Sequence, residues 1–165
     1  MNPAADVVCS VAAMRCFIAI SIPDAIKTRI GEIQEQLQRM GSGVRWVPPI
    51  SQHITLKFLG EIAPSMIPRI AEAASSIARS TPKMEIGIGR LGAFPSLNRP
   101  RVFWAGISEE GGALATLAVQ LEEKLAHLGF EPEERSWNPH ITLGRVKNAF
   151  TLKALVDYIK IETKR

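Results

Sequence analysis

The chain has little of what disulfide frameworks and metal centres need, with two cysteines and three histidines in 165 residues. Cys9 and Cys16 lie close together and match neither a disulfide framework nor a zinc motif, so we expect a reducing, cytoplasmic setting. No apolar run approaches the roughly 18 residues of a membrane span, and we expect no membrane partner. Residues 1–13 carry Asp6 but no lysine or arginine, which excludes the basic start of a secretory signal. We expect this segment to be a disordered extension.

The overall charge is only mildly unbalanced. The formal net charge is +4 and the isoelectric point is near 9.3, while the hydrophobic and charged fractions of 46% and 22% are ordinary for a globular protein. A chain of this length can bury a core as one domain or as two small lobes. The net positive charge favours phosphate-bearing partners but does not identify one.

The phrase His-Ile-Thr-Leu occurs twice, beginning at His53 and at His140. Side chains at i and i+2 of a strand share one face, so each copy offers an imidazole and a hydroxyl on the same side. Histidine titrates at about pH 6.5, so one neutral and one protonated ring can coexist near neutrality. Two such strands brought together would form an acid–base site, in which Thr55 and Thr142 donate to oxygens that develop charge.

The segments around the two phrases also repeat. A strand pattern at 15–21 or 101–107 is followed by a helical apolar stripe and then by a motif strand, at 52–59 or 139–146. His53 follows Phe17 by 36 residues and His140 follows Phe103 by 37, which indicates an internal duplication. The sequence therefore predicts an α+β fold. It would consist of two pseudo-twofold-related lobes of antiparallel-rich sheet with outer helices, and the motif strands would face a central cleft.

The remaining patterns complete this prediction. Further strands are expected over 44–47 and 83–91, and further helices over 65–79 and 151–159. The first helix, which begins at Asp24 and which Gly41 closes, shows one apolar stripe formed by Ile26, Ile30, Ile33, Leu37 and Met40.

Several other residues are candidates for the same site. Paired histidines can also bind a metal, but neither motif supplies a Cys, Asp or Glu at i+2 as a third ligand, so no metal is predicted. If side chains alternate strictly along the strand, Lys57 lies on the same face as His53 and Thr55. We therefore predict that Lys57 contacts a phosphate. Strict alternation puts Arg145 on the opposite face unless the strand bends near Gly144. The aromatic residues able to stack on a base are Trp46, Phe94, Trp104 and Trp137.

The amino-acid sequence resembles those of the two-histidine phosphoesterase superfamily. The paired motifs are specific to that superfamily, and the surrounding phrases are similar to its RNA 2′,3′-cyclic phosphodiesterase branch, also called the 2′-5′ RNA ligase (LigT-like) family. The likeness spans roughly Met14 to Lys147 and rests on MRCFIAISIP, VRWVPPISQHITLKFLGE, RLGAFPS, RPRVFWAGI and LGFEPEERSWNPHITLGRV.

This resemblance implies hydrolysis of 2′,3′-cyclic phosphates at RNA ends to 2′-phosphates, without metal or cofactor. His53 and His140 would be the catalytic acid and base, with Thr55, Thr142 and Arg145 binding the phosphate. We assign His140 as base and His53 as acid; the symmetry of the motifs leaves the reverse assignment open. The same groups run backwards would form a 2′-5′ linkage between RNA ends.

The resemblance also sets expectations for the whole chain. Residues 14–165 should form a single bilobal phosphoesterase domain that is short at its C-terminal end, because family members usually continue into further strands. We expect a monomer acting on RNA ends or on 2′,3′-cyclic nucleotides. The alternatives are an enzyme that opens another small cyclic phosphate and an RNA-binding module whose catalysis is weak or lost.

Overall fold

The computed structural model describes residues 13–133 and 136–163. The expected N-terminal extension lies, except for Ala13, outside the described residues. None of the described helices combines the length and apolar character needed to cross a membrane. The strands of the described residues are β1 (Met14–Ser21), β2 (Val44–Trp46), β3 (His53–Ile62), β4 (Gly87–Phe94), β5 (Val102–Ser108) and β6 (His140–Val146). The helices are α1 (Asp24–Gln38), α2 (Ile67–Ser80), α3 (Ala113–Ala126) and α4 (Lys153–Glu162). Two short 3₁₀ turns lie at Pro49–Ser51 and Pro64–Met66.

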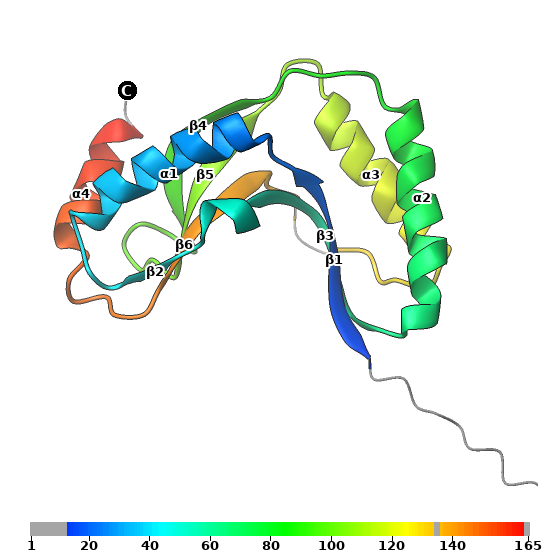
Figure 1. The fold of residues 1–165 in the computed structure, drawn as a ribbon, viewed down its shortest axis with the longest axis horizontal. Coiled ribbons are helices and arrows are strands. Elements are labelled where there is room, and N and C mark those ends of the chain that lie inside the picture. Colours follow the sequence, from blue (N-terminus) through cyan, green and yellow to red (C-terminus); the bar gives the residue numbers. More distant parts are fainter. Residues whose placement is uncertain (1–12, 134–135, 164–165) are drawn as a thin grey trace, which may run out of the picture.

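The strands form one antiparallel sheet in the order β1-β3-β6-β5-β4, and β2 pairs with β6 beside β3. Apolar side chains from one face of this sheet pack against the described helices, so the helices cover that face and leave the other open. Figure 1 shows α1 and α4 at one end of the sheet and α2 and α3 at the other. The predicted α+β class with an antiparallel-rich sheet is confirmed.

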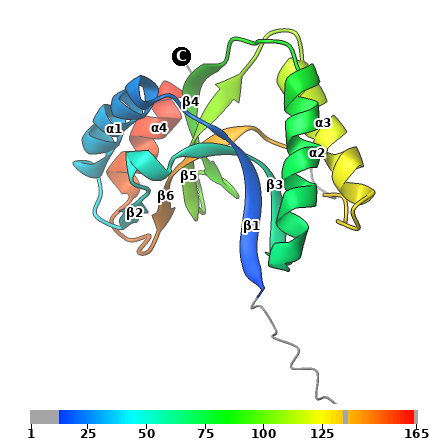
Figure 2. The same ribbon diagram turned by 45° about the vertical axis from the view of Figure 1, so that its right-hand side comes forward.

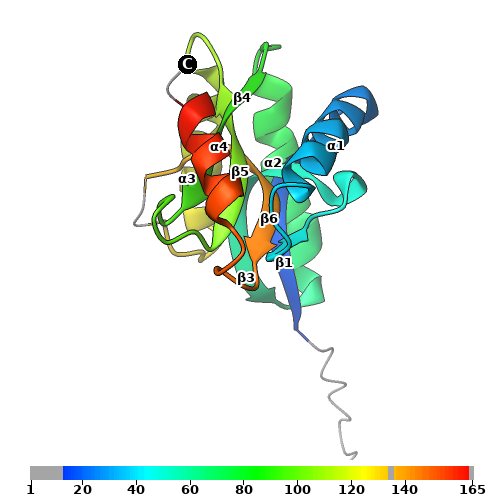
Figure 3. The ribbon, with the colours of Figure 1, turned by 90° about the vertical axis from the view of Figure 1, so that its left-hand side faces the viewer.

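The helices divide the sheet into two lobes. In the first lobe, α2 and α3 pack on Leu56, Leu59 and Ile62 of β3; in the second, α1 and α4 pack on β4, β5 and β6. Helix α1 follows β1 and α3 follows β5, so each lobe receives one helix from the other lobe's strand (Figure 2). In Figure 3, α4 lies nearest the viewer alongside β4 and β5. The lobes are therefore interlocked halves of a single sheet.

Two details differ from the sequence expectations. In α1, Ile26 and Ile33 are exposed by 39% and 43%, whereas Gln34 is buried with Ile30 and Leu37. The buried stripe is therefore rotated, because the helix buries a polar side chain that donates to the backbone carbonyls of Val47 and Leu143. Strand β4 begins at Gly87 and not at Lys83, since its partner β5 ends at Ser108, opposite Gly87.

Candidate active site

The two His-x-Thr motifs meet at the seam between the lobes. Strands β3 and β6 pair there, with Ile54 directly opposite Ile141 and both side chains buried in the core. In this antiparallel register, His53 lies beside Thr142 and Thr55 beside His140 on the open face of the sheet. Directly opposite residues have Cβ atoms about 4.5–5.5 Å apart. The four motif side chains therefore form one compact cluster.

Both imidazoles are held in the same way. Nδ1 of His53 lies 2.8 Å from the carbonyl oxygen of Ser51, and Nδ1 of His140 lies 2.7 Å from that of Asn138. A carbonyl can only accept a hydrogen bond, so the Nδ1 atom of each ring carries the hydrogen. Each neutral histidine then has its lone pair on Nε2, which is free to take up or deliver a proton.

The aromatic surroundings of the two histidines differ. Phe17 stacks on His53 with ring centroids 4.7 Å apart and an interplanar angle of 21°. Phe94 meets His140 edge-on at 5.0 Å, and Trp104 lies 6.4 Å from the same ring. The indole nitrogen of Trp104 is buried and has no hydrogen-bond partner among the described residues. Sequence reasoning found Phe94 and Trp104 as candidates but missed Phe17, which carries no motif.

Each motif strand contains a β-bulge immediately after its threonine. In β3, Thr55 pairs with Ala19 but Lys57 pairs with Ile18, which leaves Leu56 as an extra residue. In β6, Thr142 pairs with Trp104 but Gly144 pairs with Phe103, which leaves Leu143 extra. A bulge shifts the inside–outside alternation by one residue. Lys57 in β3 and Arg145 in β6, which follow these bulges, therefore face the opposite way from what strict alternation predicts.

The bulge in β3 moves Lys57 away from the histidines. Its side chain is only 4% exposed, and its ammonium group donates to Oε2 of Glu122 at 2.9 Å and to the carbonyl oxygen of Glu131 at 2.7 Å. Glu122 belongs to α3, which packs on the covered face of the sheet. The predicted position of Lys57 beside His53 and Thr55 is therefore wrong, because that prediction assumed an unbroken strand.

The bulge in β6 has the opposite effect on Arg145. Gly144 faces the core, since a Cβ atom built there would lie 2.5 Å from Val44 and 3.1 Å from Trp46. Arg145 then faces outward on the open side that carries the histidines, and its side chain is exposed. The bend near Gly144 that the sequence required for Arg145 is present in the structure as this bulge.

A buried glutamine links the two motifs through α1. Nε2 of Gln34 donates to the carbonyl oxygens of Val47 at 2.9 Å and of Leu143 at 2.8 Å. Its Oε1 accepts a hydrogen bond of 2.9 Å from Gln52, the residue before His53. Sequence reasoning missed Gln34, although its i+4 spacing from Ile30 and i+3 spacing to Leu37 place it on a core-facing stripe.

The other aromatic candidates have packing roles. Trp137 donates its indole hydrogen to the carbonyl oxygen of Thr55 at 3.1 Å and contacts both core clusters. Trp46 packs against the core of the second lobe. Across residues 13–133 and 136–163, no group of three or more His, Cys, Asp or Glu side chains is arranged to hold a metal ion.

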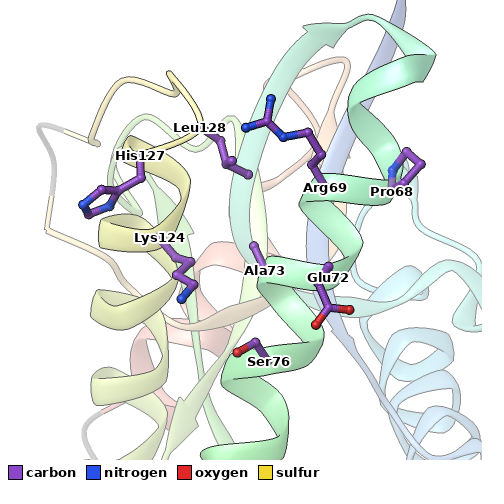
Figure 4. A pocket seen from close by; sticks show the side chains of 8 residues that line it. All are labelled: Pro68, Arg69, Glu72, Ala73, Ser76, Lys124, His127 and Leu128. Carbon is purple, nitrogen blue, oxygen red and sulfur yellow. The ribbon is translucent and has the colours of Figure 1, made fainter.

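A separate groove lies between α2 and α3, on the covered side of the sheet (Figure 4). Its volume is about 770 Å³, and it includes the third histidine, His127. Nδ1 of His127 lies 2.7 Å from the carbonyl oxygen of Glu123, at the C-terminal end of α3. His127 thus belongs to the end of a helix and not to the motif cluster.

Comparison with known proteins agrees with this geometry. A family model described as LigT like Phosphoesterase matches residues 20–104 and 106–162. The RNA 2′,3′-cyclic phosphodiesterase of Thermotoga maritima is 40% identical over 134 residues, which cover 81% of this chain and 71% of that protein. The protein of the same name from Methanocaldococcus jannaschii is 37% identical over 147 residues, covering 89% and 80%.

Solved structures give the same result. The fold matches E. coli LigT in complex with 3′-AMP with a TM-score of 0.66 and 28% identity, over 84% of this chain and 77% of that chain. It matches TT0787 of Thermus thermophilus with a TM-score of 0.67 and 29% identity, over 82% and 76%. Since the family match covers most of the chain and the curated relatives reach 40% identity, this protein belongs to the LigT-like phosphoesterase family.

Proposed function

We propose that this protein is an RNA 2′,3′-cyclic phosphodiesterase that opens the cyclic phosphate at RNA 3′ ends to a 2′-phosphate. The observation that carries the proposal is the cluster of two imidazoles and two threonine hydroxyls at the β3–β6 seam. The names of its relatives support the substrate class.

In the proposed mechanism, Nε2 of His140 takes a proton from water, whose oxygen attacks phosphorus. The bond between phosphorus and the 3′ oxygen breaks, and Nε2 of protonated His53 delivers a proton to that oxygen. The product is a 2′-phosphate with a free 3′-hydroxyl, and the two histidines have exchanged protonation states. The backbone carbonyls at Nδ1 keep both Nε2 atoms available for these transfers.

Thr55 and Thr142 are proposed to donate hydrogen bonds to the non-bridging phosphate oxygens, where negative charge grows as water adds. Arg145 is proposed as a cationic contact to a phosphate of the substrate, since its guanidinium has donors suited to phosphate oxygens. Microscopic reversibility allows the same groups to join a cyclic phosphate to an RNA 5′-hydroxyl through a 2′-5′ linkage. Hydrolysis is the proposed main direction in water.

The test is hydrolysis of 2′,3′-cyclic nucleotides by the parent protein and by His53→Ala and His140→Ala. Each catalytic variant should lose about 10²–10⁴-fold in kcat. His127→Ala is the matched control, because this third histidine lies on the far side of the sheet, and it should retain the parental rate. Parental rates in both motif variants would remove the proposal.

The reaction is proposed to need no metal, and the same assay in excess EDTA tests this. We expect an unchanged rate, because the two imidazoles supply both proton transfers. Loss of activity in EDTA that added Mg²⁺ or Zn²⁺ restores would replace the two-histidine mechanism by a metal-assisted one. Retained RNA affinity without turnover in the parent would favour the binding-module alternative.

A further inference from the structure

Two arginines face each other across the β2–β6 pair on the open side of the sheet. Arg45 of β2 is the register partner of Arg145 of β6, and both side chains are exposed. The flanking pair, Trp46 and Gly144, faces the core, so both guanidinium groups project from the surface that carries the histidines. Neither arginine forms an ion pair with any other residue in the part of the chain that the structure describes.

This arrangement is unfavourable for the fold alone. Like charges directly opposite each other on neighbouring strands destabilise a sheet, whereas opposite charges stabilise it. The same sheet shows the favourable arrangement elsewhere, because Arg15 of β1 has Glu61 of β3 as its register partner. The Arg45–Arg145 pair lacks such a carboxylate, so an anion from solution or from substrate is the group that can balance it.

The position of the pair relative to the motif cluster indicates which anion. Arg145 follows Thr142 by three residues in β6, but Leu143 is the extra residue of the bulge, so the two positions are separated by only two residues of the partner strand β5, about 7 Å. This is the scale of a neighbouring group on the same substrate and not of a second, independent molecule. Two adjacent guanidinium forks suit the oxygens of a phosphodiester, which they can bind by paired hydrogen bonds.

We propose that Arg45, together with Arg145, binds the phosphodiester on the 5′ side of the terminal nucleotide while the cyclic phosphate lies at the histidines. The inference rests on the proposed function and narrows its substrate class. The enzyme acts preferentially on the ends of RNA chains, and a cyclic mononucleotide, which lacks this phosphodiester, is the poorer substrate.

The test compares a uridine trinucleotide ending in a 2′,3′-cyclic phosphate with uridine 2′,3′-cyclic monophosphate. Arg45→Gln should lower kcat/KM for the trinucleotide about tenfold more than for the mononucleotide, mainly through KM. The slope of log kcat/KM for the trinucleotide against log salt should become shallower by about 0.7, as expected for the loss of one contact to a single strand. Arg15→Gln, an exposed arginine of the neighbouring lobe, is the matched control and should leave both quantities unchanged.

A charge reversal separates this role from a structural one. Arg45→Glu places a carboxylate opposite Arg145, so the melting temperature should equal or exceed that of the parent. The trinucleotide preference should nevertheless fall further than in Arg45→Gln. If Arg45→Gln keeps both the parental substrate ratio and the parental salt slope, the inference is wrong.

Binding of a fluorescent uridine trinucleotide with a 2′-phosphate end, followed by anisotropy, distinguishes failure of the inference from failure of the proposed function. One outcome is that the parent protein hydrolyses neither substrate and yet binds this probe about tenfold more tightly than Arg45→Gln does. That result would support the subsite and contradict the proposed activity. An inactive parent with equal affinity in the two proteins would lose both.

Discussion

At the scale of single residues, the two histidines have the same backbone anchor, so their chemical roles must be separated by the substrate. A 2′,3′-cyclic phosphate analogue with sulfur in place of the bridging 3′ oxygen has a leaving group that needs no proton. On this analogue we expect kcat of His53→Ala to lie within about tenfold of the parental kcat, because this variant lacks only the general acid. His140→Ala should keep its full deficit.

The kinetic measurement is kcat for each variant on the oxygen and the sulfur substrate. Rescue of His140→Ala in place of His53→Ala would exchange the assigned roles. Equal deficits of both variants on both substrates would contradict any division into acid and base.

Lys57 gives a second prediction at this scale. Lys57→Met should lower the free energy of unfolding by about 2 kcal/mol, because the Glu131 carbonyl and the half-buried Glu122 carboxylate lose their donor. Activity measured at a temperature where the variant is folded should remain close to that of the parent. Urea unfolding measures the first effect, with Lys83→Met as an exposed-lysine control. A large loss of kcat/KM in the folded variant would instead show that Lys57 contributes to the active site.

The residue scale also shows what the sequence could predict. The histidines and threonines could be found because the repeated phrase and its period of two residues survive up to each threonine. Lys57 and Arg145 could not be placed, because the bulges at Leu56 and Leu143 depend on the neighbouring strands β1 and β5. Alternation within one strand contains no information about an extra residue relative to its partner.

At the scale of elements, α1 positions both motif strands through Gln34. Gln34→Leu should destabilise the fold by about 2–3 kcal/mol, because the carbonyls of Val47 and Leu143 lose a buried donor and the Gln52 amide loses its acceptor. It should also lower kcat about tenfold, because the segments before His53 and after Thr142 are no longer joined. Thermal unfolding and kcat are measured beside Gln36→Leu, an exposed position on the same helix. A purely thermal effect with parental kcat would limit Gln34 to a packing role.

The helices illustrate which element-level features a sequence carries. Apolar spacing predicted both α1 and α3, since local periodicity indicates a helix, and α1 begins at Asp24 as predicted but ends at Gln38, before Gly41. It did not show that α1 packs in the second lobe and α3 in the first, because a stripe indicates that a face is buried but not against what. It also missed Gln34, since a polar residue on a buried stripe becomes intelligible only when its carbonyl partners are known.

At the scale of the whole molecule, two core clusters meet through Ile20 and Trp137, which contact both. We therefore expect the lobes to unfold together. Leu125→Ala in the first lobe and Leu155→Ala in the second each remove a fully buried side chain and should cost about 2–5 kcal/mol. In either variant, far-UV circular dichroism and tryptophan fluorescence should follow one coincident transition at a lower temperature. Two separated transitions in Leu155→Ala would show that the lobes are independent.

The paired bulges have a consequence for the polarity of the substrate. A site with perfect twofold symmetry cannot distinguish the two directions of a nucleic acid strand. The motif residues of this protein obey that symmetry, but the positions that the bulges turn outward do not, since the first lobe presents the exposed ring of Phe58 where the second presents Arg145. One flank is thus aromatic and uncharged and the other cationic. An RNA strand therefore meets a different surface on each side of the motif cluster. This difference lets the duplicated site bind the strand in one 5′-to-3′ orientation and not in the other.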